Sequence, residues 1–279
     1  MPPCTQVPLT APLVIAIAQD ATVKPTTPFA DMTNLSAMAP PKYGQDITFG
    51  IGRAAPGKED VGSTPAILEP KMRRLLTIFA GGDTTGMAKR LFDAFLDPTH
   101  RAVTYFDDAS LNSAADTHAN MNYFCSAAVS APNSPFKTAG KIRIHQALKN
   151  AGWDITKMYM PTGLGVPAFN LGNKTLSTQD FNNGLGLMLN GVQYVYVVAT
   201  HYNYDSAAGR YCMKLKFIMF DIFGLDDEDL SSFGASADSG WHTNAGIGIT
   251  AWWQLQHQHG YAPLVTRIVV EKTYDAPAE

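Results

Sequence analysis

The chain has 279 residues, of which 46% are hydrophobic and only 16% are charged, with a formal net charge of −3. This apolar content excludes an intrinsically disordered chain, which needs low hydrophobicity and high net charge. A chain of this length buries about three quarters of its unfolded surface, so it does not need a disulfide or a metal to fold. The 21 basic and 24 acidic residues leave no broad positive field, which argues against nucleic acid as a partner.

The first 70 residues are rich in proline and hold 11 of the 18 prolines. Prolines this dense disfavour helices and central strands, so residues 1–70 are predicted to form an extended arm. Such an arm wraps a domain or links it to a partner, and a partly disordered leader is the equal alternative. The apolar run Pro12–Ala18 has no basic residue before it and does not match a cleavable signal. No run reaches the roughly 18 apolar residues of a membrane-spanning helix. The protein is therefore expected to be made in the cytoplasm without a cleavable signal.

The three cysteines, Cys4, Cys125 and Cys212, are odd in number and far apart in the chain. They form no CxxC pair and no Cys/His cluster with the spacing of a zinc site. The sequence therefore predicts three free thiols and no disulfide framework.

Helical signals dominate the first half of residues 71–279. Asp83 and Thr84 precede a helical spacing of apolar residues that continues to Phe95, and Pro98 ends it. A second helix is predicted from Ser134 to Gly152, with a proline at its first position.

Strand signals dominate the second half of the chain. Residues 192–199 and 211–220 have the composition of two strands, and the turn-like 204–209 joins them as a hairpin. A helix from Thr250 to His259, ended by Gly260, precedes a last strand over 263–274. Because helices precede strands, the expected fold is α+β, with a helical half packed on an antiparallel sheet.

The segment 108–118 is the strongest candidate for catalysis, because it holds a carboxylate, an amide and an imidazole close together. Asp108 and Asn112 are four residues apart and share a helix face, and His118 follows. An Asp–His pair orients an imidazole as a general base, so Asp108 and His118 are candidates for catalysis. A capped helix with a satisfied histidine is the structural alternative.

Acidic residues also gather where the predicted hairpin ends. Asp221 lies between two phenylalanines, where burial raises the pKa of a carboxyl group and suits general acid catalysis. The stretch Asp226–Asp229 lacks the spacing of a calcium loop and is typical of a helix start. His257 and His259 diverge on a helix, so no metal site is predicted.

Four stretches resemble the uncharacterised bacterial domain-of-unknown-function family 3289, over about residues 70–274. They are Phe106-x-Asp108-x-x-Leu111-Asn112 with His118, Leu189-Asn190-Gly191, Asp221-x-Phe223-Gly224-Leu225-Asp226-x-x-Asp229, and Trp252-x-x-Leu255-Gln256-His257-x-x-Gly260-Tyr261-x-Pro263. The third is also faintly similar to the acidic motif of colicin M-type toxins, with Gly224 where a second acidic residue is expected.

The resemblance implies a secreted effector of bacterial competition, and it names no reaction. We hypothesise that the protein hydrolyses a cell-envelope component such as peptidoglycan or its lipid-linked precursor. His118 would act as base, Asp108 would orient it and Asp221 would be the acid or a ligand. The family-like stretches supply the candidate substrate contacts Asn112, Asp226, Trp252, Gln256 and His257. The expected partners are an immunity protein, a secretion-apparatus component and the cell-envelope substrate, and the sequence leaves the cofactor unknown.

Two functions of other classes remain open. A non-catalytic binding or membrane-perturbing module would use Trp252 or Trp253 and the hairpin tyrosines. The tyrosines concerned are Tyr194, Tyr196, Tyr202, Tyr204 and Tyr211. A structural component of a secretion particle is suggested by the proline-rich arm.

Overall fold

The computed structural model describes residues 4–19, 48–54, 63–136, 142–161, 163–171, 179–189, 191–235 and 243–279. At its centre lies a five-stranded sheet. The strand order is β1 (Pro8–Gln19), β3 (Tyr194–Asp205), β4 (Arg210–Phe223), β5 (Leu264–Pro277), β2 (Thr104–Asp107). Every described pairing is antiparallel except that of β2 with β5. The combination of helices with this sheet confirms the predicted α+β class.

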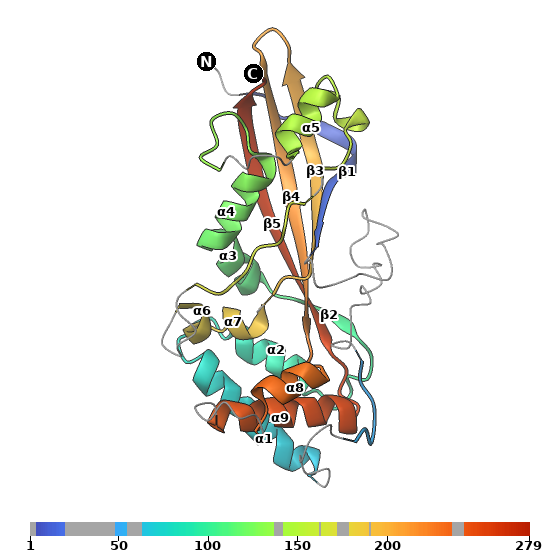
Figure 1. Cartoon of the computed structure of the whole chain (residues 1–279), viewed down its shortest axis with the longest axis vertical. Coiled ribbons are helices and arrows are strands. Elements are labelled where there is room, and N and C mark those ends of the chain that lie inside the picture. Colours follow the sequence, from blue (N-terminus) through green and yellow to red (C-terminus); the bar gives the residue numbers. More distant parts are fainter. Residues whose placement is uncertain are drawn as a thin grey trace.

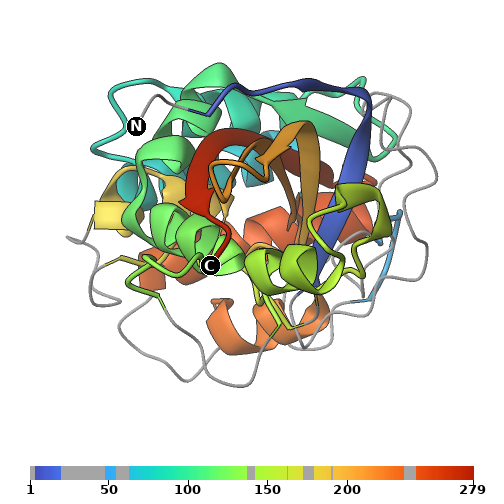
Figure 2. The same cartoon turned by 90° about the horizontal axis from the view of Figure 1, so that it is seen from above.

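The helices surround one end and one side of the sheet. The long strands run along the major axis of the molecule (Figure 1), and the view from above shows the sheet curled (Figure 2). One end of the sheet is packed by α1 (Pro65–Phe79), α2 (Met87–Phe95), α8 (Asp227–Phe233) and α9 (Thr243–Gln258). The short helices α6 (Gln179–Asn182) and α7 (Leu185–Met188) lie near this end. Farther along the strands are α3 (Ala109–Thr117), α4 (Ala119–Val129), α5 (Ile144–Asn150) and a single 3₁₀ turn (Ile155–Lys157). None of the helices in these ranges is long and apolar enough to cross a bilayer.

The central strands bury both of their faces. Along β3, Val195 and Val197 belong to the main core, whereas Tyr194, Tyr196 and Val198 belong to a second cluster on the opposite face. A strand covered on both sides is expected to be hydrophobic at consecutive positions. This explains why the run from 194 to 199 lacks a clear polar face.

The predicted hairpin is confirmed as β3 and β4. Its strands pair from Tyr194 opposite Phe220 to Asp205 opposite Arg210. The Asp205 carboxylate accepts the N–H groups of Ala207 and Ala208 at 3.0 Å each, which closes the turn.

The two predicted early helices have different outcomes. The first is confirmed as α2, and the Asp83 carboxylate accepts three N–H groups at its start, including that of Ala88 at 2.9 Å. The prediction of a helix from Ser134 to Gly152 is wrong at its start, because α5 begins only at Ile144. The Ser134 hydroxyl instead accepts the Phe136 N–H in a turn, and residues 137–141 lie outside the described residues.

The predicted division at residue 70 does not hold for the described part of the N-terminal region. β1 pairs with β3 and buries Ile15 and Ala16, so it belongs to the domain. Its prolines are tolerated because β1 is an edge strand of the described sheet. Pro65 occupies the first turn of α1, where a proline lacks no hydrogen bond. The arm predicted for residues 20–47 and 55–62 lies outside the described residues.

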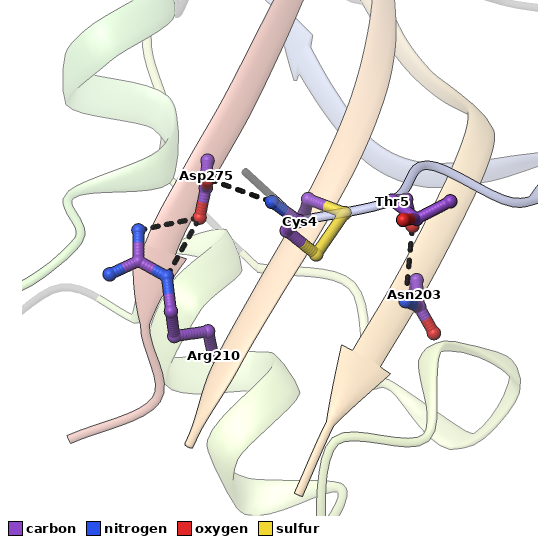
Figure 3. Close-up of a disulfide and its surroundings, with 6 residues drawn as sticks. Cys4, Thr5, Asn203, Arg210 and Asp275 are labelled. Carbon is purple, nitrogen blue, oxygen red and sulfur yellow. Dashed lines mark hydrogen bonds and ion pairs between the residues drawn. A yellow bond between two sulfur atoms is a disulfide. The ribbon is translucent and has the colours of Figure 1, made fainter. Parts of the chain in front are cut away.

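A disulfide joins Cys4 to Cys212, so the prediction of three free thiols is wrong for this pair. Cys125 is the one that is free, and it is buried. Figure 3 shows the segment before β1 crossing the strands at the disulfide. The Cys4 N–H donates to Asp275 at 3.3 Å, and Asn203 donates to the Thr5 carbonyl at 3.0 Å. The sequence could not show this pair because 208 positions separate its members.

Candidate functional site

Asp108 caps α3 and pairs with an arginine. Its Oδ1 accepts the N–H groups of Ser110 at 2.8 Å and Leu111 at 3.0 Å. Arg90 donates to both carboxylate oxygens, at 2.6 and 3.0 Å. The hydrogen bond from Arg90 holds the pKa of Asp108 below its usual value, although burial opposes this. Asp108 is therefore occupied as a helix cap and an ion pair.

His118 pairs with Asp180 instead of Asp108. The ring Nδ1 accepts the Asn120 N–H at 3.2 Å, so we assign the proton to Nε2, which donates to Asp180 at 2.9 Å. Asp180 is 0% exposed and also accepts the Leu171 N–H at 2.6 Å. The expected Asp108–His118 pair is not formed, because each residue caps a different helix and has another partner.

This environment leaves the imidazole no free nitrogen. His118 is 5% exposed, and its ring packs at 4.7 Å from that of Phe169. A general base needs a lone pair within hydrogen-bonding reach of the substrate. A neutral imidazole has one ring nitrogen that can accept a hydrogen bond, and here that nitrogen accepts the Asn120 N–H. His118 therefore joins α4 to the segment around Asp180.

Asp221 is buried within the sheet at 6% exposure. It lies on β4 opposite Thr266 of β5, and its Oδ1 accepts the Ile222 N–H at 3.0 Å. His118 is instead engaged by Asp180 and the Asn120 N–H, and Asp108 by Arg90. The predicted role of Asp221 as a catalytic acid beside His118 therefore finds no support in the geometry.

Two of the predicted substrate contacts hold backbone groups. Asn112 accepts the Val269 N–H at 2.9 Å and thereby ties α3 to β5. Asp226 caps α8, accepting the N–H groups of Glu228 and Asp229, while Asp229 in turn accepts the Asp226 N–H. This reciprocal capping box satisfies the free donors at a helix start.

The other three predicted contacts hold α9 in place. Gln256 accepts the Leu225 N–H at 2.9 Å and donates to its carbonyl at 3.1 Å. His257 also donates to this carbonyl at 2.8 Å, while Arg53 contacts its other ring nitrogen. Trp252 is 5% exposed and stacks on Phe223 at 4.1 Å. All three side chains are buried, so none faces a substrate in this conformation.

The remaining candidate residues, the histidines and the aromatic side chains, also take part in internal packing. The described residues contain no cluster of three or more potential metal ligands, and His259 contacts the Ser63 carbonyl at 2.8 Å. The hairpin tyrosines Tyr194, Tyr196 and Tyr211 are at most 6% exposed, and Trp253 is 0% exposed. The aromatic surface expected for a binding module is thus absent from these positions.

A cavity of about 280 Å³ lies between α4, the start of α5 and residues 164–168. Its walls are mainly apolar, and its polar side chains are those of Asn120, Tyr123 and Arg143. Tyr123 is 56% exposed, so the cavity opens to solvent beside it. This is the size of a pocket for a small ligand.

Arg143 gives this cavity its chemical character. The residue is 7% exposed, and its Nε and Nη1 atoms are buried and have no hydrogen-bond partner in the described part of the chain. No ion pair to it occurs within the described ranges, and it makes no side-chain cap on α5. Burial lowers the pKa of the guanidinium, and the nearby Tyr123 acts in the opposite direction. An arginine nevertheless stays protonated in proteins. The cavity is therefore lined by a positive charge that no carboxylate of the described ranges compensates.

Sequence reasoning missed both Asp180 and Arg143. Asp180 follows a polar stretch without periodicity, and Arg143 alternates with Ile142 and Ile144 as an ordinary surface residue would. Each acquires its surroundings only from segments distant in the sequence. No local motif could have found either residue.

Comparisons with protein-family models, with curated proteins and with solved structures found no match to this chain. The site must therefore be interpreted from its own chemistry.

Proposed function

We propose that this protein is an exported effector of bacterial competition that acts by binding a component of its target. The competition context comes from the resemblance over residues 70–274, and the binding mode comes from the cavity around Arg143. One observation carries the proposal: the buried Arg143 side chain lines an open cavity, and its Nε and Nη1 have no hydrogen-bond partner among the described residues. Proteins rarely bury an unpaired charge, and such groups are concentrated where a ligand completes them.

The Cys4–Cys212 disulfide supports the export part of the proposal. Disulfides form and persist in oxidising compartments, such as the bacterial periplasm and the outside of the cell, and are rare in the cytoplasm. A protein that works beyond the cytoplasm would form this bond on arrival.

Hydrolysis of an envelope component by His118 and Asp221 has less support than binding. Such a mechanism needs a reachable base, whereas both ring nitrogens of His118 are engaged and the ring is 5% exposed. Asp221 lies on β4 within the sheet and is 6% exposed. The binding proposal needs no rearrangement of these residues.

Growth inhibition on delivery of the full chain to the periplasm tests the proposal. A Gram-negative strain would produce the chain with and without an added export signal, at matched protein levels. We expect inhibition only with export, loss of inhibition in Arg143→Met, and retention in Asp221→Asn. Circular dichroism of the purified variants checks that each is folded.

Two results would overturn the proposal. One is growth unaffected by the exported wild-type chain. The other is inhibition that disappears in a folded Asp221→Asn variant and persists in Arg143→Met, which would restore the hydrolytic hypothesis.

A further inference from the structure

We infer that the Arg143 cavity binds a small molecule or chain terminus that carries one carboxylate on an apolar body. Arg143 is the counter-ion of that carboxylate. This inference rests on the proposed function, because it names the ligand class of the same cavity. It assigns a binding role to a residue outside every motif discussed above.

The charge of the ligand follows from Arg143. At 7% exposure the guanidinium has lost most of its hydration, and two of its nitrogens have no acceptor among the described residues. The neighbouring residues 137–141, Lys-Thr-Ala-Gly-Lys, contain no carboxylate that could pair with it. Nε and Nη1 point to different sides of the guanidinium, so one carboxylate can span Nη2 and one of them. Such an anionic ligand would supply the missing charge and an acceptor for that nitrogen.

The number of donors favours a carboxylate over a phosphate. A guanidinium offers parallel N–H groups that match a carboxylate in two-point geometry. A phosphate ester with more charge and more acceptors needs several donors. The amide of Asn120, which also lines the cavity, already donates to the Ala168 carbonyl at 2.6 Å. The cavity thus provides one strong cationic group for one monoanionic group.

The remaining walls select an apolar body. Phe124, Ala127, Leu164, Val166 and Pro167 surround the space next to the guanidinium. A ligand that fills this volume with polar atoms would lose hydration without gaining partners. With a volume of about 280 Å³, the site suits a body of the size of a benzyl or short aliphatic group.

An aromatic edge at the cavity mouth adds a second contact surface. Tyr123 lines the cavity and its ring lies 4.4 Å from that of Phe136 in an edge-to-face arrangement. Exposed aromatic side chains next to a cavity can pack against the part of a ligand that remains outside. The ligand can therefore extend beyond the cavity, as a peptide ending in a free carboxylate would.

Calorimetric titration of the full, disulfide-bonded chain tests this inference. The probes are hydrocinnamate, its neutral amide hydrocinnamide, phenyl phosphate, and N-acetyl-alanyl-alanine. The acid and the amide share one apolar body, so their difference reports the charge. The peptide distinguishes a chain terminus from a free acid as the source of the carboxylate.

We expect hydrocinnamate or the peptide to bind at least about tenfold more tightly than hydrocinnamide, the effect of a hydrogen bond to a charged group. Arg143→Met should remove this preference, and Arg143→Lys should retain part of it because the charge remains without the fork. Arg101→Met is the matched control, since Arg101 is exposed and lies outside the cavity lining. It should bind like the wild type.

Several outcomes would overturn the inference without the need for a mutant. One is equal binding of the acid and the amide. Another is tighter binding of phenyl phosphate than of either carboxylate. A third is that no probe binds at concentrations up to about 10 mM. Unchanged binding in a folded Arg143→Met variant would also overturn it. If growth inhibition requires Arg143 but no carboxylate binds, this inference fails and the proposed function stands. If carboxylates bind but the exported chain is harmless, the proposed function fails alone.

Discussion

Two buried basic side chains lie next to α4 and have opposite surroundings. His118, at the start of the helix, has both ring nitrogens matched, one to the Asn120 N–H and the other to the Asp180 carboxylate. Arg143, across the cavity lined by the same helix, has two buried nitrogens without a partner. The sequence indicates a catalytic role for the histidine, but it gives no such indication for the arginine.

This comparison teaches that residue type is a weaker sign of function than unsatisfied bonding capacity. A buried polar group whose partners all come from its own chain contributes to stability, since removing any partner exposes an unpaired group. A buried charge without partners costs stability. We therefore expect mutations at the two places to change stability in opposite directions.

Asp180→Ala is expected to have the largest effect. It leaves the buried His118 Nε2–H unpaired and removes the acceptor of the partly buried Leu171 N–H. The free energy of unfolding should fall by about 3 to 5 kcal/mol, as for the breaking of a buried pair. Urea denaturation measures it. Asp93→Ala is the control, because that carboxylate forms surface ion pairs and should cost less than about 1 kcal/mol.

Cys4→Ser is expected to come next. It opens a link between residues 208 positions apart and should lower the free energy of unfolding by about 2 to 4 kcal/mol. Denaturation with and without a reductant measures the effect. The reductant should destabilise the wild type and leave the variant unchanged. A wild type that is insensitive to complete reduction would contradict the disulfide's stabilising role.

Arg143→Met should act in the reverse direction. It removes unpaired buried donors and keeps most of the apolar stem, so the free energy of unfolding should rise by about 1 to 3 kcal/mol. The same urea measurement applies, with ligand-free protein. Arg101→Met should cost no more than about 1 kcal/mol, since Arg101 is exposed and loses a cation–π contact with the Tyr261 ring. Destabilisation by Arg143→Met would break the contrast between the two regions.

Asp226→Ala sharpens the contrast with a smaller effect. Loss of the α8 capping box should lower the free energy of unfolding by about 1 kcal/mol, and Asp226→Asn, which keeps an acceptor, by less. Ligand binding at the Arg143 cavity should not change in either variant. Impaired ligand binding in a folded variant would show that Asp226 contributes to binding.

The smallest expected effect is a dependence of stability on mildly acidic pH. Burial lowers the pKa of His145 and of His257 below the ordinary value of 6.5. The folded state therefore binds fewer protons than the unfolded state, and stability falls as the pH drops below about 6.5. Urea midpoints between pH 5 and 7.5 measure the slope, which His257→Gln should reduce. The carboxyl groups with a lowered pKa, such as Asp108, change the stability only in more acidic solution.

Much of the fold was predictable because its signals are local. The hairpin of β3 and β4, the cap and length of α2 and the end of α9 at Gly260 follow from alternation, capping residues and a glycine with a φ of 73°. The integration of β1 was not predictable, since whether a proline-rich strand lies free or at a sheet edge depends on a partner far along the chain.

The sequence by itself determined the α+β class, the position of the main hairpin, the helix α2 and the end of α9, and the presence of capping residues. These features depend on interactions between residues a few positions apart, which a single chain displays directly. Only the tertiary structure decided that His118 faces Asp180, that Cys4 meets Cys212, and that Arg143 lies buried without a counter-charge. Burial and long-range pairing arise from which segments pack together, and no local pattern encodes which partner a side chain will find.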